Sequence, residues 1–104
     1  MLPPDPQFEE AALAESSEKV EQPPLYKVLL HNDDYTTMEF VVWALESVFN
    51  MAEEQAIQVM LNVHLRGVGV AGIYTFEIAE TKVDRTTALA REQEFPLLVT
   101  MEKV

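Results

Sequence analysis

Three adjacent polar residues, Asn32, Asp33 and Asp34, directly follow an apolar run with the composition of a β-strand. Their amide and carboxylate oxygens accept hydrogen bonds, and the ionised carboxylates also attract positive charge. A helix that begins after them needs only one such side chain as its N-cap, so the cluster exceeds what capping requires. In isolation a solvated turn is the simpler interpretation of these residues, and a cation-binding site is the functional one.

The elements on either side of this cluster would hold it in place. Residues 26–30 are predicted to form a strand that ends at the polar residues. The next residues fit a capping box, with Thr36 as the N-cap and Glu39 three positions later. The helix predicted after them carries an apolar stripe at helical spacing: Phe40, Val41, Ala44, Leu45, Val48 and Phe49.

A second helix is predicted to begin near Glu53, with Ala52 or Asn50 as its N-cap. It should end at Gly67, a residue type favoured just after the last helical turn. Its apolar positions are Ala56, Ile57, Val59, Met60 and Val63. The next predicted elements are a flexible bend over residues 67–72, a strand over 73–78, a helix over 80–94 and a last strand over 97–102.

The predicted order β-α-α-β-α-β is typical of a small two-layer α+β domain. We expect residues 25–104 to form this domain, with a three-stranded, mostly antiparallel sheet packed against three helices. Residues 1–24 hold five of the six prolines and six acidic residues, so they are predicted to be a flexible acidic extension. An inert solubilising tail and a segment that reaches a partner are equally open interpretations of that extension.

Composition excludes several classes of function. A 104-residue chain with a net charge of −11 and only seven lysines and arginines does not suit general nucleic-acid binding. The chain has no cysteine, so it forms neither disulfides nor thiolate metal sites. No apolar run approaches the length of a membrane span, and the N-terminus lacks the basic and apolar regions of a secretory signal. We therefore expect a cytoplasmic protein with no membrane or nucleic-acid partner.

Catalytic and cofactor patterns are weak. The two histidines, His31 and His64, do not form a zinc-binding motif, and Gly67-Val68-Gly69 lacks the remainder of a dinucleotide fingerprint. Taken alone, His64 is most simply a partly exposed residue at a helix end, and Met38 and Met60 are most simply core residues. We expect no metal, no cofactor and no enzymatic activity.

Four segments together closely resemble the ClpS family of bacterial adaptors, in order and spacing from about residue 25 to the end. These segments are Tyr26 to Val41 (which includes Asn32-Asp33-Asp34), Met60-Leu61-Asn62-Val63-His64, Ala79-Glu80-Thr81-Lys82-Val83 and Phe95 to Glu102. The resemblance implies a protein that recognises N-degrons, which begin with Leu, Phe, Tyr or Trp. It would deliver them to the AAA+ unfoldase ClpA for degradation by ClpP.

The resemblance also implies roles for individual residues. The substrate's free α-amine and first peptide group would contact Asn32, Asp33 and His64, with Asp34 and Thr36 on the same rim. The side-chain pocket would consist of Met38, Val41, Met60, Val63 and Leu97. The docking surface for the unfoldase N-domain would include Glu77, Thr81 and Lys82. The partners are thus N-terminal peptides and the unfoldase, and we expect the adaptor to be a monomer.

The chemistry of these residues agrees with the implied ligand. An ammonium group has three donors, and a carboxylate, an amide oxygen and a neutral imidazole are acceptors for them. Because His64 must be neutral to accept, affinity should fall at acidic pH. Met38 would crowd β-branched side chains at the pocket mouth. The alternatives are a small acidic ribosome-associated interaction domain, similar in layout to the C-terminal domain of the ribosomal stalk protein, and, less favoured, a small hydrolase. A stalk domain has no use for Asn32, Asp33 and His64.

Overall fold

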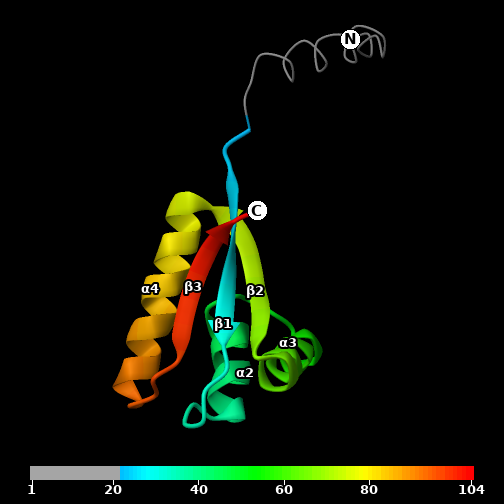
Figure 1. The fold of residues 1–104 in the computed structure, drawn as a ribbon, viewed down its shortest axis with the longest axis vertical. Helices are drawn as coiled ribbons and strands as arrows, with labels where there is room; N and C mark the ends of the chain where they lie inside the picture. Colours follow the sequence, from blue (N-terminus) through cyan, green and yellow to red (C-terminus); the bar gives the residue numbers. More distant parts are fainter. Residues whose placement is uncertain (1–21) are drawn as a thin grey trace, which may run out of the picture.

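The structure, a computed structural model, describes residues 22–104 and consists of a three-stranded sheet with three helices (Figure 1). Its elements follow the order β1 (Leu25–His31), α2 (Met38–Ser47), α3 (Glu53–Arg66), β2 (Val68–Thr75), α4 (Phe76–Glu92) and β3 (Leu98–Lys103). The predicted α+β fold and β-α-α-β-α-β order are therefore confirmed. The extension is predicted to be flexible, but its residues 1–21 lie outside the described part of the chain.

The strand β1 lies at the centre of the sheet and pairs antiparallel with both β2 and β3. Its side chains Val28 and Leu30 are fully buried, and α4 packs against all three strands. The register with β2 shifts beside Ala71, which forms a bulge opposite Val28 and Leu29. The strand begins next to the chain's C-terminus, where the Val104 N–H donates to the Leu25 carbonyl at 2.9 Å. The strand ends at the opposite end of the sheet, where the polar residues Asn32, Asp33 and Asp34 follow.

The apolar stripe predicted for the first helix forms much of the core. All six of its members are buried, and they belong to one hydrophobic cluster with Val28, Leu30, Leu97 and Val99. In α3 the same pattern is less exact, because Ala56 and Val63 are buried whereas Ile57 is 37% exposed. Not every apolar position of α3 therefore faces the core.

Residues 67–78 depart most from the predicted elements. Gly67 ends α3 in the left-handed region (φ 87°), as expected, but Val68 already begins β2. The second glycine allows close packing rather than flexibility, since a Cβ on Gly69 would lie 2.7 Å from Val63 Cγ2. The strand ends at Thr75, and the predicted strand residues 76–78 instead begin α4. Phe76 packs edge-on against Tyr26, 5.2 Å between ring centroids, so tertiary packing has overridden the local β-propensity.

The predicted N-caps are also corrected. Thr37, not Thr36, is the N-cap of α2, and its side chain accepts a hydrogen bond from the Phe40 N–H at 3.1 Å. Glu39 therefore occupies the second helical position and not the third, so the capping box with Thr36 is not formed. The helix α3 begins after Ala52, which offers no side-chain cap. Asn50 is not a cap; it lies in the left-handed region (φ 55°) in the connection between the two helices.

Candidate functional site

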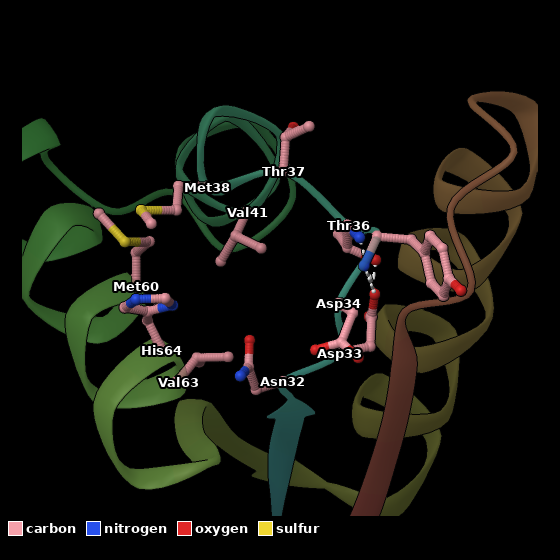
Figure 2. Close-up of a pocket in the computed structure, with 11 residues that line it drawn as sticks. Asn32, Asp33, Asp34, Thr36, Thr37, Met38, Val41, Met60, Val63 and His64 are labelled. Carbon is pink, nitrogen blue, oxygen red and sulfur yellow. Dashed lines mark hydrogen bonds between the residues drawn. The ribbon is translucent and has the colours of Figure 1, made fainter.

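A cavity of about 360 Å³ lies where β1 ends, between the following loop and the helices α2 and α3. Its size is that of a small-molecule pocket. Figure 2 shows Asn32 below the opening, Asp33 and Asp34 to one side, and the side chains of α2 and α3 around the remainder. The residues that line it are Asn32, Asp33, Asp34, Tyr35, Thr36, Thr37, Met38, Val41, Met60, Val63 and His64.

Backbone hydrogen bonds hold the loop against the end of α3. The Asn32 N–H donates to the Gly67 carbonyl at 2.9 Å, and the Gly67 N–H donates to the Val63 carbonyl at 3.0 Å. The last turn of α3 contains His64, which is exposed beside the cavity. Residues separated by 32 positions in the sequence, Asn32 and His64, are thereby brought to the rim of one cavity.

The Asp33 carboxylate organises the loop. Its Oδ1 accepts hydrogen bonds from the Tyr35 N–H at 2.8 Å and the Thr36 N–H at 2.7 Å. Its Oδ2 accepts from the Thr36 hydroxyl at 2.7 Å (Figure 2). An ionised carboxylate has about four acceptor positions, so Oδ2 keeps capacity for one further donor. Asp33 therefore shapes the turn and still offers a negative charge to a ligand.

The protonation of Asp33 follows from the same contacts. Partial burial raises the pKa of this carboxyl, but the hydrogen bonds from Thr36 and Tyr35 and the nearby charge of Arg91 together lower it further than burial raises it. The net pKa lies below the usual 3.8, so Asp33 is ionised throughout the physiological range. The cavity thus has a permanent negative charge at its polar side.

The other side of the cavity is apolar and comes from both helices. Val41 and Val63 are buried and form its inner surface, whereas Met60 is half-buried. Met38 is 48% exposed and stands at the opening. Acceptors on one side and alkyl and thioether groups on the other make the cavity suitable for a cationic group joined to an apolar side chain.

Most of the predicted site residues line this cavity, with one exception. Leu97 is only 1% exposed, belongs to the core beneath β3, and is not among the lining residues. Two lining residues, Tyr35 and Thr37, were not predicted as site residues; their position within the polar loop was the available signal. Within residues 22–104, no group of three or more histidine, aspartate or glutamate side chains is arranged to hold a metal ion.

The three predicted docking residues lie on the first half of α4, and they differ in accessibility. Glu77 and Thr81 are exposed, and the Thr81 hydroxyl donates to the Glu77 carbonyl at 3.0 Å. Lys82 instead serves the fold: its Nζ donates to the Val48 carbonyl at the end of α2 at 2.6 Å and lies within 6.0 Å of the Phe49 and Tyr74 ring centroids. This end of α4 adjoins the start of β1, because Leu25 pairs with Thr75. The predicted docking residues and the cavity therefore lie toward opposite ends of the sheet (Figure 1).

Comparison with known proteins gives a consistent result. The family model described as "ATP-dependent Clp protease adaptor protein ClpS" matches residues 21–100. A ClpS adapter from Desulfatibacillum aliphaticivorans is 57% identical over 90 residues, covering 86% of each chain. One from Methylococcus capsulatus is 58% identical over 92 residues, covering 88% of this chain and 87% of the other.

A solved structure extends the similarity to three dimensions. Agrobacterium tumefaciens ClpS2 bound to L-phenylalaninamide matches with a TM-score of 0.77 and 44% identity, covering 80% of this chain and all of the other. No helix in the described part of our chain has the length and apolarity needed to cross a membrane. These similarities favour the adaptor over the ribosome-associated and hydrolase alternatives. The chain belongs to the ClpS family, the non-catalytic adaptor proteins of the ATP-dependent Clp protease.

Proposed function

We propose that the cavity at the end of β1 binds the free α-amine and the side chain of an N-terminal Leu, Phe, Tyr or Trp. The observation that carries this proposal is the division of one cavity into an acceptor side and an apolar side. The similar ClpS2 is bound to L-phenylalaninamide, which has a free α-amine, an amide in place of the first peptide group, and a benzyl group. Each part of that molecule has a chemical counterpart in our cavity.

The roles follow from the positions of the lining residues. The ammonium would donate to the Asn32 amide oxygen, the remaining acceptor position of Asp33 and the His64 imidazole, while Asp34 and Thr36 complete the rim. The substrate side chain would contact Met38, Val41, Met60 and Val63. Leu97, which the family resemblance also implies, would support the pocket from the core rather than contact the substrate.

Magnitudes explain why both halves are needed. Hydrogen bonds to charged groups contribute about 1.5–3 kcal/mol each, and burial of a Leu or Phe side chain contributes about 1.5–3 kcal/mol. Micromolar affinity requires about 8 kcal/mol. Association itself costs at least about 4 kcal/mol, so neither the three hydrogen bonds nor the buried side chain alone leaves this value. An internal phenylalanine should therefore not bind. This restricts the adaptor to chain termini.

Fluorescence anisotropy with a labelled Phe-initiated peptide tests the proposal. N-acetylation removes the positive charge and at least one donor, so we expect the acetylated twin to bind at least about a hundredfold more weakly. Asp33→Asn should weaken binding of the free-amine peptide, whereas Asp84→Asn, the same charge change at an exposed position of α4, should not. Equal binding of the two peptides would overturn the proposal.

We further propose that the bound substrate is delivered to the N-domain of a ClpA-type unfoldase through the exposed face of α4 at Glu77 and Thr81, with Lys82 beside them. ATP-dependent proteolysis implies a cytoplasmic location, and we propose that the adaptor acts as a monomer. Residues 25–104 would be the adaptor core. Residues 1–24 would either engage the unfoldase during delivery or act only as a solubilising extension.

Charge reversal tests the docking surface. Glu77→Lys should weaken binding of the purified unfoldase N-domain, measured by calorimetry, while Glu80→Lys on the same helix serves as the matched control. Lys82 is unsuitable for this test, because its removal would also break the contact with the Val48 carbonyl. Equal weakening by the two substitutions would show a general charge effect and contradict a specific docking surface.

A further inference from the structure

A second groove, of about 490 Å³, lies between α2 and the end of α4. Its main lining residues are the aromatic side chains Phe40, Trp43 and Phe95 and the carboxylates Glu39 and Glu92. Thr37 lines both this groove and the amine-binding cavity, so the two are adjacent. No part of the proposed terminal recognition uses the groove.

The base of the groove is a row of aromatic rings. The Phe40 ring lies 5.7 Å from the Trp43 ring and 5.2 Å from the Phe95 ring, centroid to centroid. Phe40 is buried, which fixes the row to the core, whereas Trp43 is 47% exposed. An exposed indole face attracts cations, and among aromatic side chains tryptophan does so most strongly.

The charges around these rings favour a cation as well. Glu39 comes from α2 and Glu92 from α4, and within residues 22–104 no lysine or arginine lines the groove. The neighbouring Arg91 is directed elsewhere, since its Nη1 donates to the carbonyls of Phe95 and Leu97 at 2.6 and 3.2 Å. The groove therefore combines a π-face with two carboxylates, the combination that suits a guanidinium or an ammonium group.

We propose that this groove binds a basic side chain, arginine in preference to lysine, from the same peptide whose N-terminus occupies the adjacent cavity. This inference rests on the proposed function. Arginine is preferred because its planar guanidinium stacks on an indole while it donates to carboxylates. An extended chain advances by about 3.3–3.6 Å per residue, so the basic residue would lie within the first few positions after the N-terminal one. The adaptor would thus select substrates by a downstream positive charge in addition to the terminal residue.

Peptides with arginine and with its neutral isostere citrulline provide the test. A Phe-initiated peptide of otherwise glycine and serine would carry one or the other at each of the positions after the first. We expect arginine to bind about fivefold to tenfold more tightly than citrulline at one preferred position, as expected for an exposed cation–π contact with two surface charge pairs. Trp43 is the chain's only tryptophan, so its fluorescence should also change more with the arginine peptide than with the citrulline peptide.

Variants locate the effect. The ratio of arginine to citrulline affinity is measured within each variant, so a change in overall affinity does not affect it. The ratio should fall below about twofold in Glu39→Gln/Glu92→Gln and in Trp43→Leu, which keeps an apolar side chain without a π-face. It should persist in Glu80→Gln/Asp84→Asn, which removes the same charge from the other part of α4.

The possible outcomes separate the two proposals. An arginine advantage that is equal at all positions, or reduced equally by both double substitutions, would show general attraction by the acidic protein and contradict arginine binding in the groove. If the citrulline peptide binds and arginine gives no advantage, arginine binding in the groove is wrong and terminal recognition stands. Failure of the acetylation test would overturn both.

Discussion

The polar half of the proposed amine-binding cavity comes from one short loop and the end of α3, whereas the apolar half comes from the facing sides of α2 and α3. The loop is fixed by the three hydrogen bonds to Asp33 and by the bond from Asn32 to Gly67. The apolar half includes two methionines, whose unbranched side chains adapt their shape. The fixed polar half would hold the ammonium in one position. The adaptable apolar half would accept several bulky side chains.

Asp33→Ala should show the largest effect, because it removes both the charge and the support of the loop. We expect the affinity for a Phe-initiated peptide to fall at least about a hundredfold, and the free energy of unfolding to fall by about 1–3 kcal/mol. Asp33→Asn keeps an oxygen for the Tyr35 and Thr36 N–H groups, so it should cost about tenfold in affinity and little stability. Peptide titration and urea denaturation measure the two quantities. If Asn and Ala lose equal affinity, the loop does not depend on the hydrogen bonds to Asp33.

The pH dependence of peptide affinity separates the roles of Asp33 and His64, two members of the polar half of the cavity. Because the pKa of Asp33 is lowered in the folded state, its stabilising contribution is present above the unfolded value, near pH 3.9, and is lost as pH falls through the folded pKa. Asp33 therefore stays ionised between about pH 7.5 and 5.5. A loss of affinity in that interval would instead point to His64, which lines the cavity, because an imidazolium neither accepts a hydrogen bond nor tolerates an ammonium beside it.

We expect the affinity for the Phe-initiated peptide to fall between about pH 7.5 and 5.5, because a protonated imidazole cannot accept a hydrogen bond. In His64→Gln this loss should disappear, because an amide oxygen accepts without titrating, and only the titration of the peptide's own α-amine remains. His31→Gln is the matched control: His31 lies outside the cavity, with its Nε2 2.8 Å from the Thr100 hydroxyl, and its substitution should leave the dependence unchanged. A pH profile that is flat in the unsubstituted protein would exclude His64 as an acceptor.

The apolar half is best probed at Met38, which stands at the pocket opening. Met38→Ala should relieve crowding at the β-carbon of the substrate, so Ile-initiated peptides should bind about threefold to fivefold more tightly. Phe-initiated peptides should lose a similar factor, because they lose apolar contact area. Val42→Ala, about one turn further along α2 and outside the cavity, is a control for helix effects. Unchanged weak binding of Ile-initiated peptides would remove Met38 from the discrimination of side chains.

Local sequence was sufficient for the order of the elements and for the polar residues of the loop. The apolar stripe of α2 and the run before Asn32 follow the periods of helix and strand, and both are found as predicted. The boundary at Phe76 was missed because its packing on Tyr26, which lies 50 positions away, decided against the local β-propensity. Nonlocal contacts of this kind are not encoded in a short window.

The site shows the same division. Asn32 and Asp33 were recognisable as an acceptor cluster, but residue chemistry alone did not join them to His64; the family resemblance did. The structure supplies the physical connection in the bond from the Asn32 N–H to the Gly67 carbonyl. The aromatic groove depends on packing between α2 and α4, and no motif in the sequence indicates it.

The smallest expected effect concerns the N-cap of α2, which is the last residue of the polar loop. The side chain of Thr37 caps α2, whereas Thr36 and Asp33 bond to one another, so Thr37→Ala should lower the free energy of unfolding by about 1 kcal/mol through loss of the cap. Glu39→Ala should change it by less than about 0.5 kcal/mol, since Glu39 is an exposed residue of the first turn that does not complete a capping box. Urea denaturation of both variants measures the difference. A loss of about 1 kcal/mol in Glu39→Ala with none in Thr37→Ala would indicate a capping box with Thr36 and would place the start of α2 one residue earlier, which would also change how the helix presents Met38 to the pocket.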